Sequence, residues 1–212
     1  ILYDANISFL ASLLFLVHPI NTEVVSYISG VGDPLSLLFI LLCLIFYLKS
    51  LNSNTIVFQI AALLSFGLAL FSKEVAIIVP VLIMLYHYAF KKTIKANKII
   101  LFAVVLISYI LIRLAIFCPI DKPLISFGDL LARFPGFFVA LTEYLRLLLL
   151  PLDLHIEYGN RLFNLGDPRP IAGVLLALIL IIVAFLKKKN NPLFFFSVAW
   201  FFITLLPVSN IY

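Results

Sequence analysis

Long runs of apolar residues constrain this chain more than any other feature of its sequence. More than half of the 212 residues fall in eight such runs, each bounded by charged residues, Pro or Gly: 7–17, 35–48, 56–71, 75–90, 99–117, 136–150, 171–186 and 193–206. Only 12% of the residues are charged, whereas a soluble domain has about 25%. The chain is therefore predicted to be a membrane protein with no room for a separate soluble domain.

These runs are predicted to be helices rather than barrel strands. Backbone groups in hydrocarbon must be hydrogen-bonded within their own segment, and the runs lack the alternation of barrel strands. We expect an all-α polytopic membrane helix bundle with about seven spans, forming one transmembrane domain over residues 1–212. Asp33 and Pro34 are expected to supply the N-cap and the first helical residue of the second run.

The lysines predict the orientation of this bundle. They gather in three loops, at 49, 91–98 and 187–189, and the positive-inside rule makes these loops cytoplasmic. The opposite loops hold most of the acidic residues: Glu23, Asp33, Glu74, Asp121, Asp153, Glu157 and Asp167. Because acidic residues contribute little to orientation, their asymmetry indicates a site on the face away from the cytoplasm.

The run at 136–150 does not fit this pattern as a span. Crossing there would place the lysines at 187–189 outside, and Glu143 and Arg146 would each cost about 2.5–3.5 kcal/mol near the bilayer centre. We predict an interfacial helix on the outer face. Its charged stripe would hold Asp129, Arg133, Glu143 and Arg146, and its apolar stripe Phe134, Phe137, Phe138, Leu141 and Leu145. The alternative is a true span whose ion pair faces other helices.

The first outer loop combines an imidazole, an amide, a hydroxyl and two carboxylates between residues 18 and 33. A carboxylate at this position could act as general base toward an acceptor hydroxyl. Glu23, Asp33 and His18 are therefore the predicted catalytic residues. In the alternative interpretation, His18 and Glu23 only cap helix ends and contact lipid headgroups.

The turn Ser72-Lys73-Glu74 separates two apolar runs. Ser72 is expected to N-cap the following helix, and Glu74 to lie at its positive end. An ammonium beside a helix N-terminus suits a phosphate, so Lys73 is predicted to hold a lipid-phosphate group at the membrane surface, and Glu74 is assigned to the same substrate- and carrier-binding site. The alternative is an ordinary snorkelling lysine in an ion pair.

A third polar region lies at 151–170. Its Tyr158 and Arg161, together with Arg146, are predicted to contact sugar or phosphate, because guanidinium groups match phosphate and aromatic rings stack on sugars. A merely solvated loop is the alternative. His87, between two tyrosines next to a basic loop, is interpreted as an interfacial belt residue.

Several function classes find no support in the sequence. There is no Walker-type phosphate loop, His-Glu-x-x-His, Gly-x-Ser-x-Gly or paired-Cys motif. The basic residues lie in short loops rather than on one face of a soluble domain, so no nucleic-acid partner is predicted. No metal site or cofactor is predicted in this stretch, and a divalent metal in a full-length enzyme is left open.

Five motifs in this order resemble the membrane part of the TMTC-type (transmembrane and tetratricopeptide-repeat) O-mannosyltransferases and their bacterial relatives. The motifs are Phe15-Leu-Val-His-Pro-Ile-Asn-Thr-Glu-Val-Val, Ile28-Ser-Gly-x-Gly-Asp, Phe71-Ser-Lys-Glu-Val-Ala, Tyr144-Leu-Arg-Leu-Leu-Leu-Leu-Pro-Leu-Asp-Leu with Glu157-Tyr158, and Leu205-Leu-Pro-Val-Ser-Asn-Ile. The sequence departs from the family at Asn21, where a second His is common. It also has Val31-Gly32-Asp33 where an Arg-x-Asp is common, which removes an arginine from the carrier-phosphate contacts of this loop.

The resemblance implies a GT-C glycosyltransferase in the bacterial inner membrane or the endoplasmic reticulum. Such an enzyme moves mannose or another hexose from a polyprenyl-phosphate carrier to a protein or glycan acceptor, at a site facing away from the cytoplasm. The family carries an acidic catalytic motif upstream and tetratricopeptide repeats downstream. We therefore expect this chain to be a fragment that lacks both and is inactive alone.

Two other classes remain open at this point. A transporter or flippase for a lipid-linked or anionic substrate would place charge near the bilayer midplane, where Arg113 is the main candidate. A purely structural membrane subunit would leave Glu23 and Lys73 without shared geometry.

Overall fold

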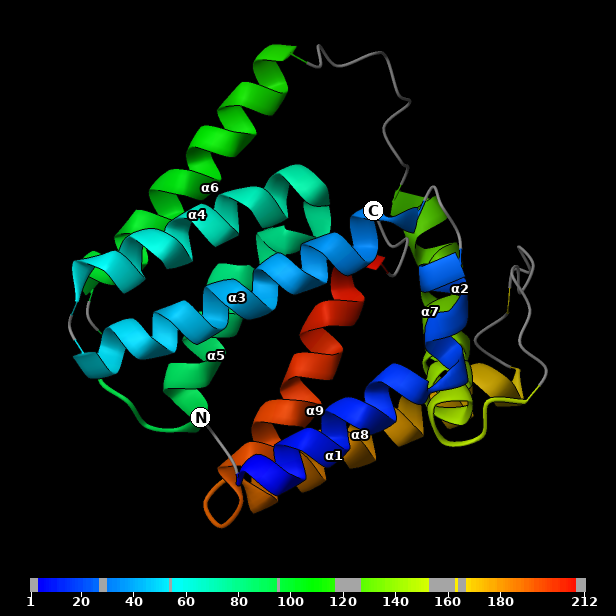
Figure 1. Cartoon of the computed structure of the whole chain (residues 1–212). Helices are drawn as coiled ribbons and strands as arrows, with labels where there is room; N and C mark the ends of the chain where they lie inside the picture. The colour runs from blue at the N-terminus through cyan, green and yellow to red at the C-terminus, as the bar shows by residue number, and fades with distance from the viewer. Residues whose placement is uncertain are drawn as a thin grey trace.

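The computed structural model describes residues 4–26, 30–53, 55–94, 96–116, 127–152, 163 and 167–208, without the side chains of 23, 25, 127–133 and 208. Within these ranges every element is a helix, as Figure 1 shows. The prediction of an all-α chain is confirmed for the residues described.

The helices follow one another with short connections. In chain order they are α1 (Ala5–Val17), η1 (Pro19–Asn21), α2 (Thr22–Ser26), α3 (Gly32–Ser53), α4 (Ile56–Ser72), η3 (Glu74–Ile78), α5 (Val79–Ala89), α6 (Ala96–Ile116), α7 (Phe127–Leu149), α8 (Pro168–Lys187), α9 (Pro192–Leu205) and η4 (Leu206–Val208). Among them α3, α6 and α8 are long and apolar enough to cross a membrane. The segments of α1, α4, η3 with α5, and α9 are apolar but shorter. About seven spans therefore remains a prediction.

Two apolar clusters hold the bundle together. The larger one joins α3, α4, η3, α5 and α6 around Tyr47, Phe66 and Phe102, which are all completely or almost completely buried. The smaller one joins α5, α8 and α9. Phe102 is the single buried residue among the described positions of α6. Ile99, Val105, Leu106 and Tyr109 are partly buried against the same cluster, and other apolar side chains of α6, such as Ile107 and Leu111, are exposed and available to lipid.

Helix α7 lies across one end of the bundle rather than along it. In Figure 1 it runs transverse to α1 and α8. It crosses α8 where Gly173, the sixth residue of α8, meets the backbone of Phe138. Its last turn accepts a hydrogen bond from His18, which follows the end of α1. Although 23 residues long, α7 is not among the described helices that qualify as spans. This arrangement supports the predicted interfacial helix.

The lysines mark the opposite end of the bundle, which we call the lysine end. Helices α3, α5 and α8 finish there and α4, α6 and α9 begin there, with these side chains at the turns: Lys49, Lys91, Lys92, Lys98, Lys187, Lys188 and Lys189. Contacts between turns confirm that they are neighbours, since the Lys98 ammonium donates to the Ser50 carbonyl at 2.7 Å. The sequence grouping of these lysines thus matches the fold.

Two local predictions were wrong. Helix α3 begins at Gly32, so Asp33 lies in its first turn and is not its N-cap. His87 is only 2% exposed and is no interfacial belt residue. Its Nδ1–H donates to the Lys92 carbonyl at 3.2 Å, and its Nε2 accepts from the Tyr47 hydroxyl at 2.7 Å. A buried imidazole is stable here because both nitrogens have partners.

Candidate functional site

Two ion pairs meet where α4 passes into η3, at the end of the bundle opposite the lysine end. The Lys73 ammonium pairs with the Asp33 carboxylate of α3, and the Glu74 carboxylate pairs with the Arg113 guanidinium in the last turn of α6. We call this place the ion-pair end. All four side chains are between 38% and 62% exposed. Solvent therefore weakens both pairs, which orient the charges more than they stabilise the fold.

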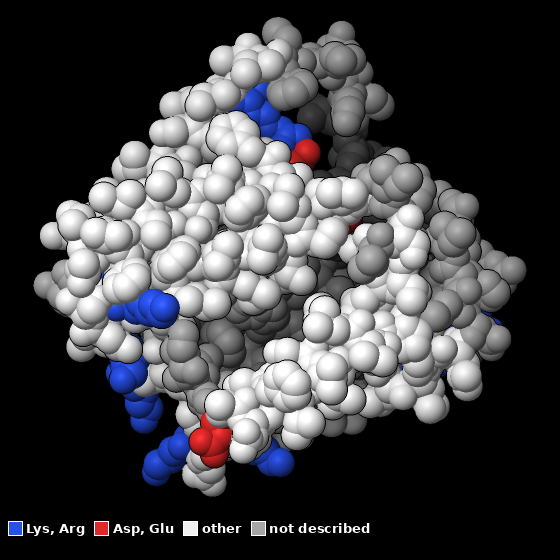
Figure 2. All heavy atoms as spheres, in the orientation of Figure 1, with Lys and Arg blue, Asp and Glu red and all other residues white. Residues whose placement is uncertain are grey.

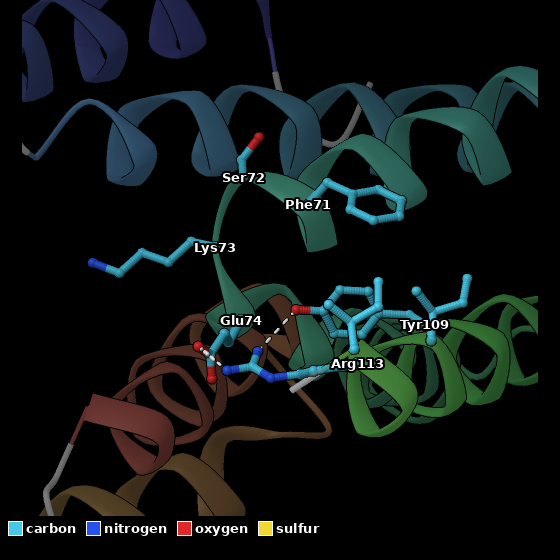
Figure 3. A pocket seen from close by; sticks show the side chains of 8 residues that line it. Phe71, Ser72, Lys73, Glu74, Tyr109 and Arg113 are labelled. Atoms are coloured by element: carbon cyan, nitrogen blue, oxygen red, sulfur yellow. Dashed lines mark hydrogen bonds and ion pairs between the residues drawn. The ribbon is translucent and has the colours of Figure 1, made fainter. Parts of the chain in front are cut away.

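The backbone at Lys73 explains why these neighbours face different helices. Helix α4 ends at Ser72 because Lys73 is extended, with φ −159° and ψ 140°. Consecutive side chains on extended backbone point to opposite sides. Figure 3 shows Lys73 and Glu74 leaving the chain in different directions.

The predicted N-cap at Ser72 was wrong. The Ser72 hydroxyl donates to the Leu68 carbonyl at 2.8 Å, within its own helix α4. The segment after Lys73 is a five-residue 3-10 helix without a side-chain cap. The α-helix N-terminus expected beside Lys73 is therefore absent from this described segment, and Lys73 must act through its ammonium alone.

A close approach of two backbones brings Asp33 to Lys73. A Cβ added at Gly32 would lie 3.0 Å from the Ser72 carbonyl oxygen, which is tighter than ordinary packing. One turn further along α3, the buried Ser36 hydroxyl donates to the Ala69 carbonyl of α4 at 3.4 Å. The start of α3 is thus held against the end of α4.

A pocket of about 430 Å³ opens between this junction and the end of α6. Its walls are formed by Phe71, Ser72, Lys73, Glu74, Tyr109, Ile112, Arg113 and Ile116. Both the α4–η3 junction and α6 contribute charged and apolar residues to these walls. Arg113 Nη1 donates to the Tyr109 hydroxyl oxygen at 3.0 Å, and the Tyr109 ring meets Phe71 edge-on with centroids 5.7 Å apart. These contacts are visible in Figure 3.

Only Lys73 and Glu74 of the lining were predicted as site residues, and the contacts among Phe71, Tyr109 and Arg113 were missed. Phe71 lies inside a motif quoted for the resemblance, and Tyr109 and Arg113 are four residues apart, which places them on one helix face. The only available signal was a polar pair near the end of an otherwise apolar run. Arg113 was considered only as a midplane charge, and the structure instead places it in the last turn of α6.

His18 and Arg146 belong to a second group, where α1 and α7 end. His18 Nδ1 accepts from the Ile20 amide at 3.2 Å, and its Nε2–H donates to the Leu148 carbonyl at 3.0 Å. These two hydrogen bonds are what the alternative interpretation predicts, in which His18 caps helix ends. Arg146 Nε donates to Glu143 at 2.7 Å, and its Nη1 donates to the Leu152 carbonyl at 3.2 Å.

The remaining predicted site residues lie outside the description of the structure. They are the side chain of Glu23, and Tyr158 and Arg161 entirely. The structure thus brings together Asp33, Lys73 and Glu74 and places His18 and Arg146 in the second group. Among the described residues no three His, Cys, Asp or Glu side chains converge on a metal position.

Comparison with known proteins gives one informative match. A protein O-mannosyl-transferase of Caenorhabditis elegans is 26% identical over 215 residues, an alignment that covers 98% of this chain and 31% of the relative. The chain thus spans about a third of the length of that relative. No family model and no solved structure match the chain. The match supports a distant relationship to a glycosyltransferase, which is the coarser part of the resemblance found in the motifs.

Proposed function

We propose that this chain is part of a membrane glycosyltransferase that moves a hexose from a polyprenyl-phosphate carrier to a protein or glycan acceptor. The relative that matches nearly the whole chain is a mannosyl-transferase, which supports the class of reaction. The lysine end supports the orientation, because a cytoplasmic lysine end leaves the ion-pair end facing away from the cytoplasm.

The pocket at the ion-pair end is the observation that carries this proposal. Arg113 lines it together with Ile112 and Ile116 of the apolar helix α6. Lys73 also borders the pocket, with its ammonium directed away from Arg113 toward Asp33, as Figure 3 shows for the direction of its side chain. The pocket thus combines charged and apolar side chains, and a lipid phosphate likewise combines a charged headgroup with a long apolar chain. Because the pocket lies where apolar helices end, such a ligand could bind with its chain still in the membrane.

The ion pairs also suggest how the site would work. A carrier phosphate held by Arg113 in the pocket would draw the Lys73 side chain around from Asp33, and the phosphate would then replace Asp33 as the partner of the ammonium. A freed Asp33, or Glu23, would then take the proton from the acceptor hydroxyl. The hydroxyl oxygen would bond to the anomeric carbon while the bond from that carbon to the phosphate oxygen breaks. The products would be the glycosylated acceptor and the polyprenyl phosphate.

The transporter alternative is less well supported. It requires charged groups near the bilayer midplane and discontinuous helices in related halves. Arg113, its main candidate, lies in the last turn of α6 and pairs with Glu74. Both described groups of charge besides the lysine end lie where helices start or finish, which suits surface chemistry better than a path through the membrane.

The test compares Lys73→Ala with Lys49→Ala in the full-length protein, by measuring hexose transfer from the polyprenyl-phosphate donor in membrane vesicles. Both variants lose one exposed lysine charge, but Lys49 lies at the lysine end. We expect Lys73→Ala to weaken donor use about 10- to 100-fold, the value of a hydrogen bond to a charged group, and Lys49→Ala to leave it unchanged. Absence of transfer by the wild type, or equal activity of the two variants, would refute the proposal.

Glu23→Gln tests the acceptor side in the same assay. If Glu23 removes the acceptor proton, this variant should bind the donor normally and lose about 10²- to 10⁴-fold in turnover. If Glu23 only caps a helix, the amide still accepts a hydrogen bond and the loss should stay within about tenfold, near 1.4 kcal/mol. A near-normal rate would remove Glu23 from the site and leave Asp33 as the base.

A further inference from the structure

Two basic turns that are about a hundred residues apart in the sequence meet at the lysine end. The Lys188 ammonium of the α8–α9 turn lies 2.9 Å from the ring centroid of Tyr88 in α5, and 5.1 Å from that of Phe195 in α9. Beneath them Leu85, Ala89, Ala184 and Phe195 form the smaller apolar cluster. The turn after α5 and the turn after α8 therefore form one surface.

Hydrogen bonds fix the backbone of both turns. In the α8–α9 turn, the Asn190 and Asn191 amides donate to the Lys187 carbonyl at 3.1 and 2.7 Å, and Asn191 Oδ1 accepts from the Phe194 amide at 3.1 Å. In the α5–α6 turn, His87 bonds to the Lys92 carbonyl, and the Lys92 amide donates to the His87 carbonyl at 3.1 Å. Their lysines thus extend from ordered backbone.

The surface carries a concentrated positive charge. Its lysines are Lys91, Lys92, Lys187, Lys188 and Lys189, and all except Lys188 are exposed. Figure 2 shows Lys and Arg side chains gathered around this part of the molecule. In the view of Figure 2, acidic atoms in red take up much less of this part of the surface than the blue basic groups. The positive-inside rule requires such charge but neither the meeting of two turns nor an aromatic contact between them.

We propose that these two turns form a binding site for the headgroup of an anionic phospholipid. Basic pockets between helices on the cytoplasmic side of membrane proteins are typical sites for such headgroups. The exposed apolar side chains of Phe185 and Leu186, in the last turn of α8, lie directly next to the lysines and provide a surface for the acyl chains. The site is distinct from the pocket at the ion-pair end and does not depend on the function proposed there.

Native mass spectrometry of the full chain tests this proposal, by comparing retention of phosphatidylglycerol with retention of phosphatidylcholine. We expect the wild type to prefer phosphatidylglycerol. Lys188→Gln should reduce that preference about fivefold, the effect of one lysine charge near an anionic surface. The matched control is Lys49→Gln, which removes a lysine that belongs to neither turn of the site and lies over Phe58, 5.7 Å from its ring centroid.

Two results would overturn the site. One is a wild type without preference for phosphatidylglycerol, and the other is an equal loss in Lys49→Gln and Lys188→Gln, which would indicate only a diffuse field. If Lys188→Gln does not fold in phosphatidylcholine, the double variant Lys91→Gln/Lys189→Gln replaces it. That variant removes two exposed charges without touching the contact with Tyr88, and it should lower the preference further than the control does.

Discussion

Gly173→Ala tests the crossing of α7 and α8 directly. The added methyl carbon would lie 2.2 Å from the Phe138 carbonyl oxygen, 2.7 Å from its carbonyl carbon and 2.9 Å from its Cβ. An ordinary carbon–oxygen contact is about 3.3 Å or more, so α7 would have to move by about 1 Å. A side-chain rotation does not relieve this clash, because the nearest atoms belong to the backbone.

The expected effect follows from two opposing terms. Overpacking of this kind costs about 1–3 kcal/mol, whereas replacing a helical glycine by alanine gains about 0.5–1 kcal/mol. The matched control is Gly67→Ala in α4, where the new methyl group meets nothing within 4 Å. That variant should show the gain alone. The two variants should therefore differ by about 2 kcal/mol in unfolding free energy, or about 4–8 °C in Tm for a chain of this size.

Thermal unfolding in detergent micelles, followed by circular dichroism, measures this difference. Gly173→Ala should unfold below the wild type and Gly67→Ala slightly above it. If Gly173→Ala is as stable as Gly67→Ala, α7 does not cross α8 at Phe138, and the support for an interfacial helix is lost.

Two further predictions concern the core and the orientation. Tyr47→Phe removes the hydroxyl that donates to His87 Nε2 and leaves a buried acceptor unpaired. It should therefore lower the unfolding free energy by about 1–3 kcal/mol in the same thermal unfolding assay. An unchanged Tm would show that the hydrogen bond does not form. In a chain without Cys43 and Cys118, a cysteine at position 74 should react with an impermeant reagent from outside the cell, and a cysteine at 188 should not. Labelling at 188 would show that the predicted orientation is wrong.

The helices were predictable because hydrophobic runs are the strongest signal in this sequence. Their bounds were less so where polar residues join a helix. Helix α7 begins at Phe127, whereas its apolar run begins only at 136. The run starts late because Asp129 and Arg133 interrupt the apolar pattern and because Pro135, which lies inside the helix, bounds the run. Helix α3 likewise extends past both ends of its apolar run, to Gly32 and Ser53. A search for apolar runs finds the part of a helix that faces lipid or core, and misses its polar ends.

The partners within the candidate site were much harder to predict. An ion pair was one alternative for Lys73, but Asp33 is 40 residues away and was assigned to the acceptor side of the site. Their contact depends on the approach of Gly32 to the Ser72 carbonyl, and a single sequence does not show which glycine permits such an approach. His87 was misplaced for a similar reason, because its hydrogen bond to Tyr47 joins two helices whose packing the pattern does not reveal.

One extended residue accounts for the geometry of the ion-pair end. If α4 continued as an α-helix through residue 74, the side chains of Lys73 and Glu74 would be only about 100° apart around the helix axis. They would then face roughly the same neighbour. The extended backbone at Lys73 turns them to opposite sides, so that one reaches Asp33 of α3 and the other Arg113 of α6. The pocket forms on the Arg113 side of this break. The two adjacent charges therefore reach different helices only because α4 stops at Ser72.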